Sequence, residues 1–378
     1  MSPMRELDLS TLLSWLLIAY TMELDNEFEH RMAAVEQHRA FGTSLVLWEN
    51  FLQYINPEGT GVGDLVKRAG IAPQTVHMYL ATERWGYVTV ERHRADRRTG
   101  RPRPEWVVRR TAVGERAGAV WPELHDVVEQ RWIDRFEAAV VSDLRRSLQA
   151  IVADLGVDRP RYLPMVGFAD GMRAHLPPVE ARRPPRSSDG TERVSLATLL
   201  SLVLVELTID FERRSHLSLA LSATVLRALD DGAQRMRDLP SLTGVPKETI
   251  RASTGFLARQ GYVTIEADAM SRTGTVRLTP EGRHARRAYL QLVEEVRAEW
   301  EGRFGRATVE QLRESLLRVL EQRDGDHYRL SHGLVPYPEG WRAKRPYLTQ
   351  TRAMIADPTT ALPHYPLITH RGGWPDGS

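Results

Sequence analysis

An internal repeat is the feature that most constrains this chain. Residues 70–111 (GIAPQTVHMYLATERWGYVTVERHRADRRTGRPRPEWVVRRT) are typical of a short polar helix, a glycine stop and two strands that flank a basic tip. Residues 244–279 (GVPKETIRASTGFLARQGYVTIEADAMSRTGTVRLT) follow the same order, with GYVT after the helix, then RTG, then a strand that ends in Thr. Such self-similarity indicates one supersecondary unit that occurs twice.

The repeat extends beyond these two segments. The apolar run Leu9 to Asp25 matches Leu196 to Glu212, and both contain the tetrapeptide TLLS. Near the end of each half, LRRSL at 144–148 matches LRESL at 312–316. Each apolar run predicts a helix that packs against more than one partner, since it is apolar around most of its circumference.

The repeat also sets the domain boundaries. We predict one domain in residues 1–186 and a second in residues 187–355, because a chain of 378 residues is long for a single core. The segment 181–193, ARRPPRSSDGTER, has the composition of an exposed linker. Residues 356–378 are rich in Pro and Gly but hold several large apolar side chains, so we expect an irregular segment that packs on a domain surface.

Within each half, turn residues mark the ends of the elements. A short helix is predicted to end at Gly70 or Gly244, and another begins within a few residues, which is helix-turn-helix spacing. Gly86 and Gly261 are predicted to end that second helix in a left-handed conformation.

The alternating segments YVTVER and YVTIEA then predict strands, and EWVVRR and TVRL predict the return strands. Val88 and Val90 are expected on one face of the first outgoing strand, and Val263 and Ile265 on one face of the second. Thr111 and Thr279 are predicted N-caps of long helices. Those helices carry apolar stripes made of Trp121, Leu124, Val128, Trp132 and Phe136 in the first half, and of Leu292, Val296, Trp300 and Phe304 in the second.

The second helix of a helix-turn-helix enters the major groove of DNA, where every base pair presents a distinct pattern. Such a helix needs short polar or basic side chains near its N-terminus. The candidate base-reading residues are Gln74, Thr75, His77 and Met78 in the first half and Lys247, Thr249 and Arg251 in the second. The alternative interpretation of these residues is an ordinary solvated helix face.

The hairpin tips differ between the halves. The first tip is strongly basic against the single acid Asp96, and its candidate contacts to phosphates or to a minor groove are Arg94, Arg97, Arg98, Arg101 and Arg103. The second tip offers only Arg272, beside Glu266 and Asp268. We therefore expect the two halves to bind DNA unequally, although a basic run can also be a solvated loop.

These segments resemble the winged-helix regulators of the multiple-antibiotic-resistance-regulator (MarR) family. The residues that carry the resemblance are GVPKETI, LARQGYV and SRTGTVRLTPEG within 244–282, and GIAPQTV, RWGYV, DRRTG and RTAVGE in the first half. The first half departs from the pattern in its longer, proline-containing wing, and the second in the spacing of Asp268 and Arg272.

The resemblance implies a fold and a way of working. The expected fold is mainly α with small β-hairpins (α+β), in which two winged helix-turn-helix units are joined by a helical, dimerisation-like core with pseudo-two-fold symmetry. Members of the family usually act as homodimers, so a duplicated chain could supply both halves as a monomer and read an asymmetric operator in double-stranded DNA. The expected function is a transcriptional regulator, a repressor that a small-molecule effector releases.

The resemblance places an effector in a cleft between the helical core and the winged helix. The aromatic and imidazole side chains that could line such a cleft are Trp15, Tyr20, His30 and Trp48. Aromatic residues at helical spacing are also typical of a plain core, and that alternative stays open.

The sequence gives no sign of an enzyme. The chain has no cysteine, so thiolate chemistry is excluded and a reducing, cytoplasmic setting is expected. The segment GTGVGD at 59–64 lacks the Gly-Lys-Ser/Thr of a nucleotide site, and the histidines of residues 327–370 lack paired metal-ligand spacing. We expect no cofactor and no metal. The apolar run from Leu12 to Tyr20 is also shorter than the roughly 20 residues of a membrane span.

Two rival functions remain. A tandem winged-helix protein of replication or of the nucleoid would also need two unequal DNA-binding units. Alternatively, the two units could contact protein instead of DNA. The net charge is only +2, so attraction to DNA has to come from local clusters of arginine and not from the overall balance.

Overall fold

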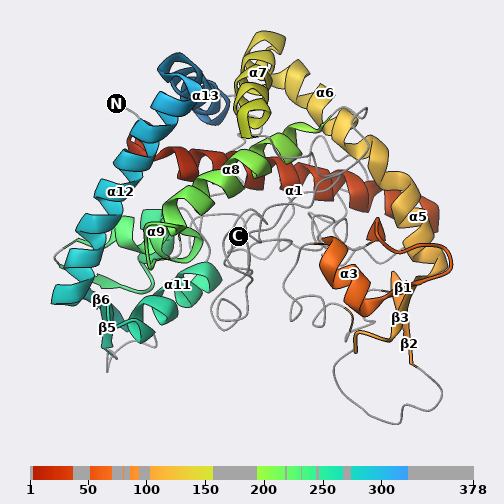
Figure 1. The fold of residues 1–378 in the computed structure, drawn as a ribbon, viewed down its shortest axis with the longest axis horizontal. Coiled ribbons are helices and arrows are strands. Elements are labelled where there is room, and N and C mark those ends of the chain that lie inside the picture. The colour runs from red at the N-terminus through yellow and green to blue at the C-terminus, as the bar shows by residue number, and fades with distance from the viewer. Residues whose placement is uncertain are drawn as a thin grey trace.

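The computed structural model describes residues 3–36, 52–69, 80, 86–92, 103–155, 194–217, 219–230, 232–243, 247–266 and 274–321. Within these ranges the protein is mainly helical, with two small antiparallel sheets (Figure 1). This agrees with the predicted class of helices with small hairpins. No described helix is both long and apolar enough to cross a bilayer.

The first half contains a 3-10 turn, five described α-helices and a second 3-10 turn. Their bounds are η1 Pro3–Glu6, α1 Leu9–Glu36, α3 Val62–Ala69, α5 Ala112–Val120, η2 Trp121–Glu123, α6 Leu124–Phe136 and α7 Ala138–Leu155. The described helices of the second half are α8 Leu196–Glu212, α9 Leu219–Ala228, α10 Leu239–Thr243, α11 Lys247–Arg259, α12 Pro280–Phe304 and α13 Arg306–Glu321.

Helix α1 is longer than the apolar run predicts, since it continues past Asp25 to Glu36. Its polar second half is held by ion pairs, in which Glu27 accepts from Arg131 at 2.8 Å and Arg31 donates to Glu123 at 3.0 Å. Phe28 and Met32 continue the apolar spacing into this half and are buried, while the partners of its charged residues lie about a hundred residues away.

Each half contains a three-stranded antiparallel sheet with the shortest strand first in sequence. The first sheet has the order β1-β3-β2 and the second has the order β4-β6-β5. The strands are β1 Thr60–Gly61, β2 Val88–Glu91, β3 Val107–Arg110, β4 Ala233–Arg235, β5 Val263–Glu266 and β6 Thr275–Leu278. Both hairpins were predicted, whereas the short strands β1 and β4 are too brief to show alternation.

The residues on this face of the outgoing strands differ in burial. Val88 and Val263 are buried and Val90 is partly buried, but Ile265 is 46% exposed. Ile265 lies opposite Val276, which is fully buried on the central strand.

Two predicted turns have the expected geometry. Gly261 has φ +76° and ends α11 in a Schellman motif, in which the N–H of Tyr262 donates to the carbonyl of Leu257 at 2.9 Å and the N–H of Gly261 donates to that of Ala258 at 3.0 Å. Gly86 has the same sign of φ, +73°. The helix predicted to precede Gly86 lies outside the described residues, except for Leu80.

Both predicted N-caps are confirmed. The hydroxyl of Thr111 accepts from the N–H of Gly114 at 3.1 Å, and that of Thr279 accepts from the N–H of Gly282 at 2.9 Å. Each cap satisfies an N–H that the helix itself leaves without a partner.

Glycine is required three residues after each cap because the hairpin passes close by. A Cβ at Gly282 would lie 1.8 Å from the carbonyl oxygen of Tyr262, and one at Gly114 would lie 2.0 Å from that of Tyr87. The helix can therefore approach the start of its own sheet only at a residue without a side chain.

The long helices differ between the halves. Residues 112–136 are divided into α5, η2 and α6, whereas α12 is continuous. Pro122, which occupies the position of Leu290 in the second half, has no N–H to continue the helical ladder. The predicted stripes face the core in both halves: all are buried except Leu292, which is partly buried and packs against the core.

The two halves share one helical core. The first helices α1 and α8 pack against each other, as do the last helices α7 and α13. Across the halves, α7 also contacts α8 and α1 contacts α13. In Figure 1 the two sheets lie at opposite ends of the molecule, on the same side of the α1 and α8 pair.

Candidate functional site

The segment from α9 to β6 is the more completely described of the two helix-and-sheet units. The buried face of α11 carries Ile250, Phe256 and Leu257, and it packs against α9 and β5. Its opposite face exposes Arg251 and Arg259. Thr254 lies on the buried side, where its hydroxyl donates to the carbonyl of Ile250 at 2.7 Å. The amphipathic pattern of α11 thus turns a basic face to solvent.

Further exposed arginines lie on other elements of this unit and on α12. They come from β4 and the residues after it, from β6 and from the first turns of α12: Arg235, Arg237, Arg277 and Arg287. Sequence reasoning missed these residues because they are scattered among acids along the chain. Only their common exposure on neighbouring elements of one unit makes them candidates for contacts with an anionic polymer.

Few of the sequence-predicted DNA contacts fall within the described residues. Lys247, Thr249 and Arg251 belong to α11, and Arg103 is a partly exposed residue before β3. The others lie outside the described residues: Gln74, Thr75, His77, Met78, Arg94, Arg97, Arg98, Arg101 and Arg272.

Three of the four predicted effector-lining residues can be placed. Tyr20 is fully buried, donates to the carbonyl of His125 at 3.0 Å and meets Trp132 edge-on. Burial raises the pKa of the Tyr20 hydroxyl well above its ordinary value. Trp15 is partly buried against the same core, and His30 is partly buried on α1. None of these lines the cavity described next, and Trp48 lies outside the described residues.

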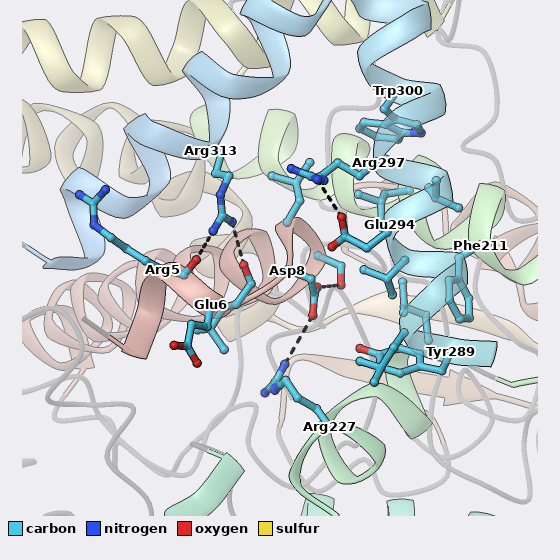
Figure 2. Close-up of a pocket in the computed structure, with 18 residues that line it drawn as sticks. Arg5, Glu6, Asp8, Phe211, Arg227, Tyr289, Glu294, Arg297, Trp300 and Arg313 are labelled. Carbon is cyan, nitrogen blue, oxygen red and sulfur yellow. Dashed lines mark hydrogen bonds and ion pairs between the residues drawn. The ribbon is translucent and has the colours of Figure 1, made fainter. Parts of the chain in front are cut away.

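A cavity of about 280 Å³ lies where the start of the chain meets the second half (Figure 2). Its walls come from residues 5–10 and from α8, α9, α12 and α13. Phe211, Tyr289 and Trp300 supply aromatic surface, and Arg313 reaches it from α13. We call it the Arg313 cavity. A volume of this size, lined by apolar and charged side chains, is suited to a small organic ligand with a polar group.

Two arginines bind the residues at the start of the chain that form one wall of the cavity. Arg313 donates to the carbonyl of Leu7 at 2.7 Å and also to the carbonyl of Arg5. Arg227 of α9 donates to the hydroxyl of Thr11 at 2.6 Å and lies 3.7 Å from a carboxylate oxygen of Asp8. Asp8 and Thr11 begin α1, so these contacts tie the first half to the second helix-and-sheet unit.

The internal repeat supplies a reference for Arg313. Residues 124–136 and 292–304 align without gaps, and by the same offset Arg145 corresponds to Arg313. Arg145 donates to the carbonyl of Val194, just before α8, at 2.8 Å, as Arg313 does to Leu7 just before α1. The two contacts are reciprocal between the halves.

The carboxylate that neutralises this arginine is present in the first half alone. Arg145 pairs with buried Glu129, with Nε to Oε1 at 3.0 Å. The second half has Arg297 at the position of Glu129. Among the described residues, no carboxylate lies within ion-pair distance of Arg313. Burial lowers the pKa of Arg313, and the positive charge of Arg297 lowers it further. Arg313 therefore brings to the cavity wall a guanidinium without the close carboxylate partner that Arg145 has, while Arg297 is paired with Glu294 of the same wall at 2.7 Å.

Across the described ranges, no group of three or more histidine, aspartate or glutamate side chains is arranged as a metal site would be. No family model, no curated protein and no solved structure matches this chain. Inferences about function therefore depend on the residues and contacts described above.

Proposed function

We propose that this protein is a sequence-specific regulator that binds double-stranded DNA, working as a single chain whose halves form an intramolecular pseudo-dimer of winged-helix units. The observation that carries the proposal is the order of elements in the second unit. Helix α10 is followed after three residues by α11, and then by the hairpin β5 and β6, which pairs with β4. A helix-turn-helix with an adjoining hairpin is an established way of reading a major groove.

The exposed face of α11 supports this assignment. Lys247 and Thr249 begin the helix, and Arg251 follows one turn later with an exposed side chain. Residues near the N-terminus of such a helix are those that reach base edges. In the proposal, Lys247 and Arg251 contact bases, while the exposed arginines of β4, β6 and α12 contact phosphates.

The arrangement of the halves supports a pseudo-dimer. Equivalent helices contact each other in the pairs α1 with α8 and α7 with α13, and the clamps from Arg145 and Arg313 are reciprocal. Both sheets lie on one side of the core (Figure 1). Two half-sites of one duplex could thus be read by one chain. Because residues 74–78 and 247–251 differ, the operator should be asymmetric.

Selection of bound sequences from random duplex DNA tests the proposal. We expect one short asymmetric site and an affinity that falls steeply with salt. Enrichment of iterated repeats would instead favour a replication or nucleoid protein. Absence of duplex binding even at low salt would favour a protein-interaction module and would refute the regulator.

Charge reversal at the first wing gives a sharper test. The double variant R97E/R98E should lower affinity about 10- to 100-fold and reduce the salt dependence, since two phosphate contacts are lost. The matched control is R306E/R318E on α13, where both arginines are exposed and remote from the sheets. Equal effects of the two variants would show a nonspecific response to charge.

Oligomeric state tests the pseudo-dimer separately. Light scattering should give the mass of one chain, 42.9 kDa, both free and at the concentrations used for DNA binding. A stable dimer at low concentration would contradict the intramolecular arrangement, whatever the result with DNA.

The effector part of the proposal uses the Arg313 cavity. We propose that it takes a small organic anion with an apolar body, whose charge offsets that of Arg313 and whose body contacts Trp300. The cavity is bounded by α9 and α12, which join the second DNA-binding unit to the core, so a ligand that fits only one placement of this unit would shift its position.

Thermal shift assays with benzoate and with benzamide test the cavity. Benzoate should stabilise the protein more than its neutral analogue, and R313A should abolish the difference. The control R318A, on the same helix and exposed, should preserve it. Equal responses to both compounds, or an unchanged response in R313A, would exclude this cavity as an anion site.

A further inference from the structure

The first helix of each half packs against the long helix of the same half, α1 against α6 and α8 against α12. One polar contact is the same in both interfaces. Glu23 accepts from the indole N–H of Trp132 at 3.2 Å, and Asp210, which occupies the corresponding position, accepts from that of Trp300 at 3.0 Å. In both halves the carboxylate lies on the first helix and the indole on the long helix. This contact would therefore form equally well if a first helix packed on the long helix of the other half.

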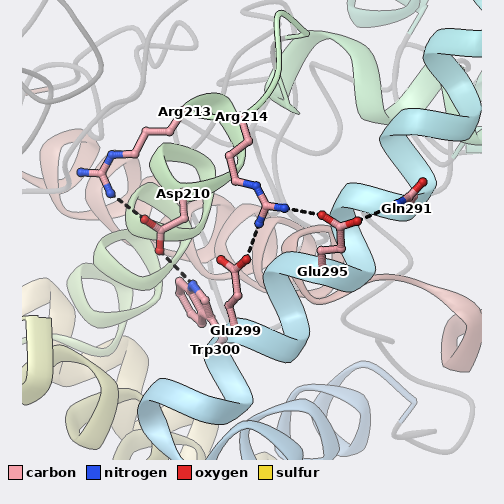
Figure 3. A network of polar contacts seen from close by, with 7 residues as sticks. All are labelled: Asp210, Arg213, Arg214, Gln291, Glu295, Glu299 and Trp300. Atoms are coloured by element: carbon pink, nitrogen blue, oxygen red, sulfur yellow. Dashed lines mark hydrogen bonds and ion pairs between the residues drawn. The ribbon is translucent and has the colours of Figure 1, made fainter.

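About one turn along, the charges are reversed between the halves. In the first half, Glu27 on α1 accepts from Arg131 on α6 at 2.8 Å. In the second half, Arg214 just after α8 donates to Glu299 and to Glu295 on α12 (Figure 3). Glu27 corresponds to Arg214, because each lies four residues after the carboxylate that binds the tryptophan. Arg131 corresponds to Glu299, because each directly precedes that tryptophan.

This reversal distinguishes correct from exchanged pairing. If α1 packed on α12, Glu27 would face Glu299 and Glu295, and if α8 packed on α6, Arg214 would face Arg131. Like charges at such distances repel. The repulsion would be little screened around Glu27 and Arg131, whose side chains are only 7% and 15% exposed.

The helices that would exchange partners are neighbours in the native structure. Helices α1 and α8 pack against each other, and α8 contacts α6 as well as α12. Exchange of an element between copies is a low-cost route to dimers, and in this chain a first helix could meet the long helix of either half of a second copy. A duplicated chain that keeps similar helices in adjacent places is exposed to this hazard, and specificity then needs a contact that penalises the wrong partner.

We propose that the reversed ion pairs, Glu27 with Arg131 and Arg214 with Glu299, commit each first helix to the long helix of its own half and so prevent dimers in which a first helix of one copy packs on the other half's long helix in a second copy of this chain. The inference rests on the pseudo-dimer part of the proposed function. It assigns to these four residues a role in choosing partners in addition to their contribution to stability.

The test is to place the acid on the first helix and the arginine on the long helix in both halves. The triple variant R214E/E295R/E299R keeps complementary charges within the second half but makes them match those of the first half. Its residues are 38% to 61% exposed, so the native fold should tolerate the change. The neutral variant R214Q/E295Q/E299Q removes the discrimination without adding an attraction. The control R306E/E310R reverses an exposed pair within α13.

Each full-length variant is unfolded in urea at high protein concentration, refolded by dilution and analysed by size-exclusion chromatography with light scattering. We expect wild type and control to return as monomers, the neutral variant to give some dimer, and the triple variant to give several-fold more. A dimer fraction in the triple variant no greater than in wild type would overturn the proposal, as would an equal increase in the control. DNA binding is measured separately, on protein that was never unfolded, and it tests the proposed function alone. A failure of the exchange proposal can therefore be told apart from a failure of the proposed function.

Discussion

The buried carboxylate of Glu23 offers a quantitative test of how each first helix is held on the long helix of its own half. Glu23 is 5% exposed, and it accepts from Arg135 at 2.7 Å and from the indole N–H of Trp132 at 3.2 Å. Replacing it with alanine leaves a guanidinium that is only 13% exposed and an indole N–H without this acceptor. Loss of one partner of a buried ion pair costs about 3 to 5 kcal/mol.

The matched variant is D210A in the second half. Asp210 accepts from Trp300 at 3.0 Å, but both of its arginines are exposed: Arg213, 2.9 Å away, is 38% exposed, and Arg303, 4.0 Å away, is 43% exposed. Those arginines remain hydrated when the carboxylate is lost, so the main penalty is an indole N–H without this acceptor, about 1 to 3 kcal/mol. We therefore expect E23A to lose more free energy of unfolding than D210A by roughly 2 kcal/mol.

Equilibrium urea unfolding, followed by circular dichroism and tryptophan fluorescence, measures both losses. E23Q should fall between wild type and E23A, because its amide oxygen can still accept from Trp132 but carries no charge for Arg135. A loss from D210A equal to or larger than that from E23A would refute the reasoning, since burial of the arginine would then not decide the penalty.

Further predictions concern single residues of the same framework. G282A should destabilise the protein by about 1 to 3 kcal/mol or more, because its Cβ would overlap the carbonyl of Tyr262, whereas G302A, with nothing within 4 Å, should stabilise α12 slightly in thermal unfolding. Burial alone would raise the pKa of Glu27, but hydrogen bonds from its two arginines outweigh it and lower that pKa below the ordinary 4.5. The stability from Glu27 is thus fully present above pH 4.5 and lost as the pH falls through its lowered value, so wild type should lose more free energy of unfolding on acidification than E27Q. G261A should cost about 1 kcal/mol in urea unfolding, since φ is +76° there.

Much of the local structure could be predicted from the sequence. The caps at Thr111 and Thr279, the turn at Gly261 and the two hairpins follow from a few adjacent residues, because a cap hydroxyl, a positive φ and strand alternation are each satisfied within one or two turns of chain. The internal repeat strengthened these predictions, since each half gave the same pattern independently.

The candidate sites needed the tertiary structure. Trp15 and Tyr20 were chosen as effector-lining residues because they are aromatic and helical, but nothing in their spacing distinguishes a cavity wall from a core. The Arg313 cavity brings together the start of the chain and helices about three hundred residues away, as the contact of Arg313 with Leu7 shows by a separation of 306.

The sequence by itself determined that this protein has two related halves, each with helices, a hairpin and an aromatic stripe, because periodicity and turn chemistry are local and repeat along the chain. Only the tertiary structure decided which helices meet. Glu27 and Arg214 become a matched and reversed pair only when their partners, about 85 to 104 residues away, are folded against them. Charges act through space and not along the chain, so their meaning appears only after packing has set the distances.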